Sequence, residues 1–343
     1  MKNKKAILNV LFLLIVFGLT LYYVFYGEDM AALAGYIGQS NVVYWLVGVV
    51  SVVLFIMGES VIIYYMMHSI GQPVVLTHCF LYSFVGFFFS AITPSATGGQ
   101  PAQLYFMKKD KLSVSVSTLI LMIVTITYKS VLVVIGVAVM ILRPAMLMKY
   151  LQPVLGWCYL GVALNVFCVA FMMLLVFHPT LAENIVLTIV KWVGKVVHFK
   201  KEKQMIAKIT ASMEKYRSVA DYLRRNKKVI INVFLITFVQ RCIWFFITYL
   251  IYLSFSLYGV DPVTITTLQG MISVSVDMLP LPGGMGISEN LFLQIFKPIC
   301  GENLVLPVMV VSRGISYYAQ LIISAVMTIV AYITIGKMGK KES

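Results

Sequence analysis

Long apolar runs separated by short polar breaks organise most of this sequence. After an initial run that ends at about Phe25, apolar stretches occupy positions 42–66, 76–93, 113–141, 154–178, 229–257, 263–280 and 303–336. About 20 consecutive apolar residues are needed for an α-helix to span a bilayer. The pattern therefore predicts an all-α polytopic membrane protein, and the first run is too long for a typical cleaved signal segment.

Two of these runs end in segments that break helices. Run 76–93 leads into Thr-Pro-Ser-Ala-Thr-Gly-Gly-Gln-Pro at 93–101, and run 263–280 leads into Leu-Pro-Gly-Gly-Met-Gly at 281–286. In a bilayer, non-helical backbone is tolerated only where protein or a watery cavity surrounds it. Each segment is therefore either a loop outside the membrane or a buried hairpin tip.

The positions of Lys and Arg decide between these alternatives for the first segment. A full crossing by 76–93 would leave 6 Lys/Arg in the cytoplasm and 18 outside. A re-entrant hairpin leaves three outside (Arg143, Lys149, Lys297) and three within helices, so 21 of the 27 are cytoplasmic. Because cytoplasmic loops are enriched in Lys and Arg, the sequence predicts six full spans, two oppositely directed re-entrant hairpins, and cytoplasmic termini.

Composition supports this class and excludes others. Apolar residues make up 60% of the 343 residues, charged residues 12%, and the mean hydropathy is +0.92, which is too apolar for a soluble domain. The net charge of +14 follows from topology, so we expect no nucleic-acid partner. The five cysteines show no C-x-x-C spacing, and no G-K-[ST] follows Gly98-Gly99. We expect no metal and no cofactor.

Six ionisable side chains fall within the predicted spans and hairpins. They are Glu59, Lys129, Arg241, Asp277, Glu289 and Arg313. A charge at the centre of a membrane helix costs about 2.5 to 3.5 kcal/mol on insertion scales, so idle charges are not expected there. The equal numbers of each sign leave two alternatives open, namely ion pairs that fix helix register and contacts to a substrate.

Two oppositely directed hairpins with similar tips are typical of an inverted-repeat transporter whose substrate binds where the tips meet. Arg241 and Arg313 are the candidate phosphate ligands, because guanidinium binds phosphate oxygens bidentately. Glu59, Asp277 and Glu289 are candidate counter-ions for a cationic head group. Glu289 has the alternative role of complementing a helix N-terminus, and Asp277 that of capping a helix end.

At these residues the chain resembles a known family. The runs Pro94-x-x-x-Gly98-Gly99-x-Pro101 and Leu279-Pro-Leu-Pro-Gly-Gly-Met-Gly-Ile-Ser-Glu289 are similar to paired motifs in the flippase-like transmembrane domain of lysylphosphatidylglycerol synthases (the MprF family). Arg313 with Tyr317-Tyr318 resembles a further family feature. The resemblance covers essentially the whole chain. Tyr128-Lys129 departs from it, since many relatives carry an acidic-basic pair there.

The resemblance implies one flippase-like domain over 1–343, in a stand-alone form without the soluble synthase domain. From the two hairpins meeting at a central site, we expect the tips to contact the substrate; the tip residues concerned are Gly98, Gly99, Gln100, Pro282, Gly283 and Gly284. For the glycines, close packing of backbones is an alternative explanation.

The soluble segment 179–228 carries 12 Lys/Arg against 4 Asp/Glu. Its first part, with Val186, Val190 and Val197, has the pattern of a helix lying in the head-group plane. We expect it to contact anionic lipid head groups, and docking of a separate synthase is an alternative. Its second part has under three heptads, too few to establish a coiled-coil pairing with a second copy.

The function predicted from these features is translocation of a phospholipid between leaflets of the bacterial cell membrane. By resemblance, aminoacylated phosphatidylglycerol such as lysylphosphatidylglycerol is the leading substrate, with a link to resistance against cationic antimicrobial peptides. One alternative is transport of a polyprenyl-phosphate-linked sugar or other glycolipid. Others are an intramembrane lipid transferase with Glu289 or Asp277 as base, and a scaffold for a separate synthase.

Overall fold

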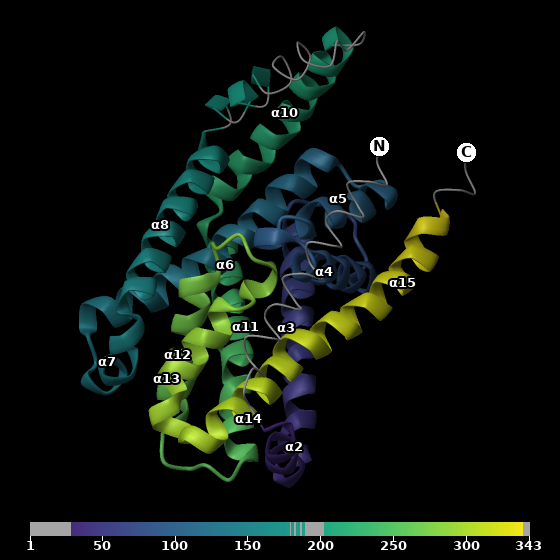
Figure 1. Ribbon diagram of the computed structural model, residues 1–343. Coiled ribbons are helices and arrows are strands. Elements are labelled where there is room, and N and C mark those ends of the chain that lie inside the picture. The colour runs from purple at the N-terminus through teal and green to yellow at the C-terminus, as the bar shows by residue number, and fades with distance from the viewer. Residues whose placement is uncertain (1–28, 179, 182, 186, 189–201, 339–343) are drawn as a thin grey trace.

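A computed structural model describes residues 29–178, 180–181, 183–185, 187–188 and 202–338 (Figure 1). Within these residues all regular secondary structure is helical. The α-helices are α2 (Met30–Gln39), α3 (Val42–Ser69), α4 (Leu76–Ala91), α5 (Gly99–Lys109), α6 (Val114–Leu142), α7 (Ala145–Leu151), α8 (Leu155–Phe177), α10 (Glu202–Arg225), α11 (Lys227–Ser254), α12 (Pro262–Val276), α13 (Ile287–Cys300), α14 (Glu302–Arg313) and α15 (Gln320–Met338).

Five helical stretches of the described residues are long and apolar enough to cross a membrane. They are Val42–Ser69, Val114–Leu142, Ala145–Phe177, Lys227–Ser254 and Glu302–Ile335. Each coincides with one of the predicted full spans. The predicted first span, ending at about Phe25, lies outside the described residues. The last span differs from a plain helix, because a π-helical turn, Gly314–Ala319, interrupts it between α14 and α15.

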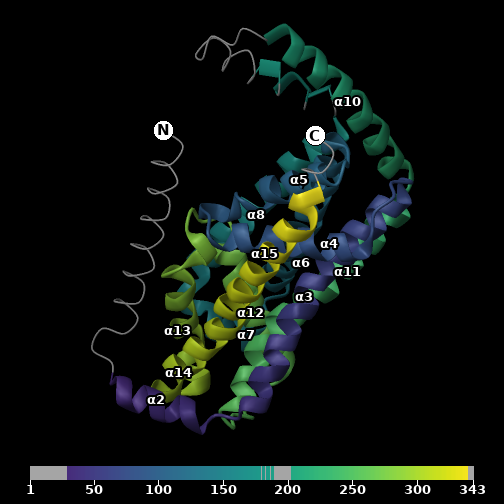
Figure 2. The same cartoon turned by 90° about the vertical axis from the view of Figure 1, so that its right-hand side faces the viewer.

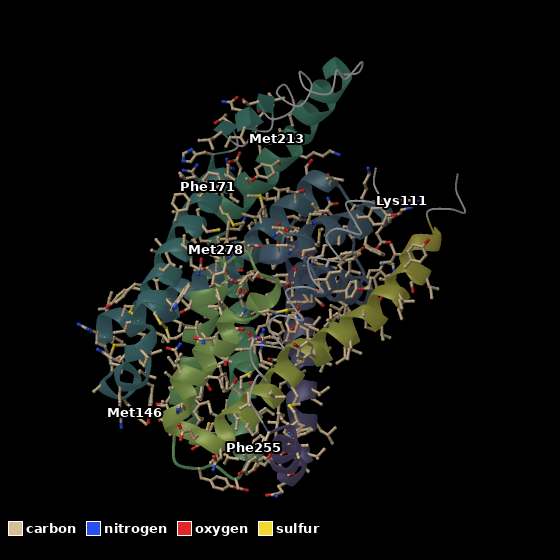
Figure 3. The ribbon with its side chains drawn as sticks, viewed as in Figure 1. Lys111, Met146, Phe171, Met213, Phe255 and Met278 are labelled. Atoms are coloured by element: carbon tan, nitrogen blue, oxygen red, sulfur yellow. The ribbon has the colours of Figure 1, made fainter. Side chains whose placement is uncertain are left out.

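Large apolar side chains cover much of the outer surface of these spans. Phe167 on α8 is 70% exposed, and Leu46 on α3 and Ile322 on α15 are exposed to a similar extent. Figure 3 shows such side chains along the molecule, with Phe171 on the outside of α8. In water this surface would be unfavourable, whereas lipid tails solvate it. The outward apolar faces are thus those of a multi-pass membrane protein.

The two predicted hairpins are present. In the first, α4 and α5 are joined by a 3₁₀ turn at Pro94–Ala96, and in the second, α12 and α13 are joined by one at Pro282–Gly284. The 16 residues of α4 and 15 of α12 are too few to span a bilayer. The hairpins start from opposite ends of the molecule, and their two 3₁₀ turns contact each other (Figures 1 and 2).

Two hydrophobic cores flank this meeting point. One surrounds the second hairpin and includes Leu268, Phe292 and Phe296. The other surrounds the first hairpin and includes Tyr82 and Met107. The second hairpin is therefore anchored in one core and most of the first hairpin in the other, while Phe84 of α4 reaches into the core of the second.

The connector's described part is mainly α10, which packs against α6 and α8 (Figure 1). Tyr216, Ala220 and Leu223 form its buried face, and the Tyr216 hydroxyl donates to the Leu175 carbonyl at 3.2 Å. The predicted head-group-plane helix with Val186 and Val190 falls mostly outside the described residues. What the connector contacts beyond this chain remains a prediction.

Candidate substrate cavity

Proline and a threonine side chain shape the first hairpin tip. Thr93 is extended because a residue before proline avoids the helical region, and Pro94 then starts the 3₁₀ turn. The Thr93 hydroxyl donates to the Phe89 carbonyl at 2.6 Å and accepts from the Gly98 N–H at 2.8 Å. One side chain therefore satisfies backbone groups on both sides of the break, as buried backbone requires.

The second tip repeats this design with glycines. Leu281 is extended before Pro282, and Gly283, Gly284 and Gly286 have positive φ angles of 57°, 67° and 83°. Such angles strain residues with a β-carbon. The Glu289 carboxylate accepts from the Gly286 N–H at 2.7 Å, so this glutamate does complement the N-terminus of α13.

Close packing explains two tip glycines directly. A β-carbon on Gly99 would lie 2.7 Å from the Gly86 carbonyl oxygen, and one on Gly283 would overlap the ring of Tyr317. Real carbon atoms do not approach their neighbours this closely. The packing alternative raised from the sequence is therefore sufficient at these positions, and lipid contact by the tip residues stays a prediction.

Arg313 and Tyr317 tie the two tips together. The Tyr317 hydroxyl donates to the Ala91 carbonyl of the first hairpin at 2.8 Å, while its ring covers Gly283 of the second. Arg313 donates through Nε to Glu289 Oε1 at 2.7 Å and through Nη2 to the Gly283 carbonyl at 3.0 Å. Arg313 precedes the π-helical turn and Tyr317 lies within it, and such distortions are frequent at functional sites.

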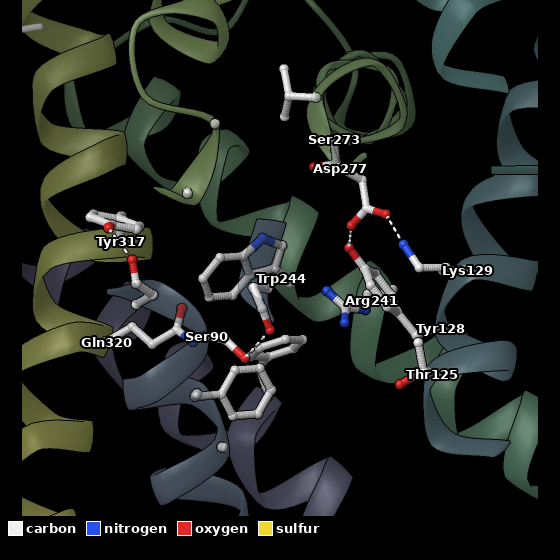
Figure 4. Close-up of a pocket in the computed structure, with 18 of the residues that line it drawn as sticks. Ser90, Thr125, Tyr128, Lys129, Arg241, Trp244, Ser273, Asp277, Tyr317 and Gln320 are labelled. Atoms are coloured by element: carbon white, nitrogen blue, oxygen red, sulfur yellow. Dashed lines mark hydrogen bonds and ion pairs between the residues drawn. The ribbon is translucent and has the colours of Figure 1, made fainter. Parts of the chain in front are cut away.

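A cavity of about 510 Å³ lies where the tips meet (Figure 4). It is lined by both hairpins and by α3, α6, α11 and the π turn. Of the predicted site residues, the lining contains Glu59, Gln100, Lys129, Arg241, Asp277, Gly283, Gly284 and Arg313. The other four do not line it, namely Gly98, Gly99, Pro282 and Glu289. Residues far apart in the sequence therefore converge on one cavity.

Four of the six predicted charges form two ion pairs. Lys129 pairs with Asp277, which also accepts from the Tyr128 hydroxyl, and Figure 4 shows both contacts. Arg313 pairs with Glu289. Asp277 is also the C-cap of α12, as the sequence suggested. The ion-pair alternative is therefore realised at these four residues, which join α6 to α12 and the last span to α13.

Arg241 is bound differently. Its guanidinium carbon lies 3.5 Å from the ring centroid of Tyr128 and 4.9 Å from that of Phe55. Its Nε is buried without a hydrogen-bond acceptor among the described residues. Cation–π contacts hold such a cation without neutralising it. A buried cation at a cavity wall with a free N–H is arranged to receive an anion.

Glu59 is the acidic counterpart of Arg241. Its Oε1 accepts from Gln103 Nε2 at 2.7 Å, and within the described part of the chain it forms no ion pair. Gln103 comes from α5, so the first hairpin positions this carboxylate. The described cavity wall therefore carries one unpaired group of each charge.

Sequence reasoning missed several polar and aromatic lining residues. These are Ser90, Gln103, Thr125, Trp244, Gln269, Ser273 and Gln320. They are uncharged and lie on helices, so no motif marks them. Burying a glutamine side chain costs free energy unless its amide is hydrogen-bonded. Gln103 and Gln269, which are both hydrogen-bonded, could have been recognised as candidate lining residues by their position among apolar residues.

The cavity offers ionic and hydrogen-bonding groups without a metal centre. No group of three His, Cys, Asp or Glu suited to a metal ion occurs in the part of the chain that the structure describes. Asp277 and Glu289, the two candidate bases, are each held by a cation.

A comparison with protein families matches residues 7–324 to the transmembrane region of lysylphosphatidylglycerol synthases. No curated protein matches the chain significantly. The family match covers most of the 343 residues and includes both hairpins and all cavity-lining elements. The helical multi-pass fold agrees with a transmembrane region. By this match the chain belongs to the lysylphosphatidylglycerol synthase transmembrane-region family.

Proposed function

We propose that this protein moves a phospholipid between the leaflets of a membrane, and that aminoacylated phosphatidylglycerols are its leading substrate class. The observation that carries this proposal is the cavity between the hairpin tips, with the unpaired Arg241 in its wall. The family match supports a role in handling lysylphosphatidylglycerol. Translocation of the lipid between leaflets is our own addition to the role that the family match supports.

Arg241 is the phosphate ligand in this proposal. Guanidinium offers planar paired donors that fit phosphate oxygens, and here the stacked rings of Tyr128 and Phe55 fix its plane. Arg313, the other candidate from the sequence, already uses Nε and Nη2 to hold the second tip. Arg241 therefore binds the lipid, and Arg313 keeps the cavity in shape.

The arrangement of the hairpins supports alternating access. Each tip is a helix break, the two hairpins pack mainly in different cores, and Tyr317 connects the tips. Discontinuous helices that meet at a central site are typical of secondary transporters. Movement of one hairpin relative to the other would open the cavity to either side.

Leaflet exchange in liposomes tests the proposal. Purified full-length protein, reconstituted without soluble partners, is expected to speed exchange of labelled phospholipid and to leave its mass unchanged. Exchange should fall about 10- to 150-fold in Arg241→Gln, because a hydrogen bond to a charged partner is worth about 1.5 to 3 kcal/mol. Arg143→Gln, at an exposed residue after α6, is the matched control and should exchange normally.

Two results would contradict the proposal. A lipid product of new mass would favour the transferase alternative, in which this chain performs chemistry. Equal exchange rates in wild type, Arg241→Gln and protein-free liposomes would remove translocation as its function.

A further inference from the structure

Among the described charges around the cavity, one group of each sign forms no direct ion pair. The pairs Lys129–Asp277 and Arg313–Glu289 are each neutral. The remaining charged lining residues are Arg241 and Glu59. Glu289 lies outside the lining but neutralises Arg313, so these six described groups sum to no net charge, with one cation and one anion in the wall outside any ion pair.

Arg241 and Glu59 are neighbours that do not pair with each other. Phe55, which lies against the guanidinium, and Glu59 are four residues apart on α3, so they share one face of that helix. No ion pair joins these two described side chains; the aromatic rings hold Arg241, and Gln103 holds Glu59. Both side chains line the same cavity, so one ligand bound there could contact each of them.

We infer that the cavity selects a phospholipid head group with one phosphodiester and one ammonium. This inference rests on the proposed function and specifies its substrate. Charges that lack a direct partner away from water are unfavourable, and a ligand group of opposite sign lowers that cost. A zwitterionic head group does so at both places, with its phosphate on Arg241 and its ammonium on Glu59.

The same charges disfavour two related lipids. Phosphatidylglycerol has no ammonium, so Glu59 would stay uncompensated. Lysylphosphatidylglycerol carries a second ammonium, for which the other acidic lining residue, Asp277, is already taken by Lys129. The remaining lining near these groups, such as Gln269 and Ser273, is neutral. Head groups with a single amine, as in phosphatidylethanolamine or alanylphosphatidylglycerol, match the cavity best.

A lipid panel tests this selectivity on the wild-type protein. Liposomes containing the full chain would receive trace amounts of phosphatidylethanolamine, alanylphosphatidylglycerol, phosphatidylglycerol or lysylphosphatidylglycerol with identical labelled acyl chains. Both single-amine lipids should exchange at least about tenfold faster than the other two, the lower bound for one lost charged hydrogen bond.

The outcomes distinguish a failure of the head-group selectivity from a failure of the proposed translocation function. Exchange of lysylphosphatidylglycerol or phosphatidylglycerol as fast as the single-amine lipids would overturn the selectivity and leave translocation intact. Exchange of no lipid would overturn the proposed function itself. A preference for only one of the two single-amine lipids would also overturn the inference, because both carry the same charges.

Glu59→Gln isolates the ammonium subsite. It should lower exchange of both single-amine lipids and raise that of phosphatidylglycerol, because the carboxylate that phosphatidylglycerol leaves without a partner is gone. The control is Glu302→Gln, which removes an exposed carboxylate that pairs with Lys297 outside the cavity. Unchanged single-amine exchange in Glu59→Gln would overturn the assignment.

A binding measurement covers the case in which Glu59→Gln does not fold. Short-chain versions of the four lipids would be added to wild-type protein in detergent, and the thermal midpoint of unfolding recorded. Ligands that bind only the folded state raise this midpoint in order of affinity. The single-amine lipids should raise it most, and an equal or larger rise with the lysyl lipid would contradict the inference.

Discussion

At the scale of single residues, Tyr317 is a side chain that touches both hairpin tips. Its hydroxyl donates to the Ala91 carbonyl, and its ring lies against Gly283. Without this hydroxyl the first tip would have a backbone acceptor lacking a partner in a poorly hydrated site. Tyr317 therefore stabilises the closed contact between the tips, and Gly283 is needed to admit its ring.

Tyr317→Phe should lower the free energy of unfolding by about 0.5 to 1.5 kcal/mol, the net value of one hydrogen bond. The phenyl ring still covers Gly283, so packing is retained. Thermal unfolding of the purified protein in detergent measures the effect. Tyr332→Phe, at a residue that is 61% exposed on α15, is the control and should unfold like wild type. Equal midpoints for all three proteins would show that the tip contact contributes nothing.

Gly283→Ala should destabilise the protein more strongly than a typical glycine substitution. The new β-carbon meets the Tyr317 ring, and the positive φ adds about 1 to 2 kcal/mol of strain. Gly156→Ala on α8 is the matched control, because no atom lies within 4 Å of the position that its β-carbon would take. Alanine favours helix there by up to about 1 kcal/mol. The two variants should shift the unfolding midpoint in opposite directions, and equal shifts would contradict the packing argument.

At the scale of elements, ion pairs fasten the second hairpin to neighbouring helices. Lys129 on α6 holds Asp277 at the end of α12, and Arg313 at the end of α14 holds Glu289 on α13. Both arms of the second hairpin are thus tied to spans by charge. The first hairpin instead uses hydrogen bonds from glutamines, Gln100 to α6 and Gln103 to α3.

Breaking the Lys129–Asp277 pair from one side should cost about 3 to 5 kcal/mol, because it leaves one charge buried and uncompensated. Lys129→Met is therefore expected to unfold at a much lower temperature. The double variant Lys129→Met with Asp277→Asn should recover most of this loss, since no net charge remains and Asn can still accept from Tyr128. A double variant less stable than Lys129→Met would show that the pair does not act as a unit.

At the scale of the whole molecule, the two ends differ in charge. The end that contains the C-terminus of α5 and the start of α11 carries Lys108, Lys109, Lys111, Lys227 and Lys228. In Figure 3, Lys111 marks this end, while Met146 and Phe255 mark the opposite one. Arg143, Lys149 and Lys297 belong to that opposite end. The positive-inside rule therefore makes the lysine-rich end cytoplasmic in our proposal.

Cysteine labelling in intact cells tests this orientation. All five native cysteines are free thiols and would first be replaced by serine or alanine. Lys149→Cys should then react with a membrane-impermeant maleimide added from outside. Lys109→Cys should react only after the cells are opened. Labelling of Lys109→Cys from outside would contradict the orientation, and with it the cytoplasmic entry of the first hairpin.

The sequence alone determined the class of protein, five of the spans that the structure describes, and both hairpins. These features depend on local properties, namely the length of apolar runs and the effect of proline and glycine on the backbone. The sequence also identified the six charged candidates, but not how they associate. Lys129 and Asp277 are 148 positions apart, and their pairing depends on how α6 and α12 are rotated toward each other. Only the tertiary structure therefore decided that Arg241 and Glu59 stay unpaired, because long-range helix packing sets which opposite charges come within reach.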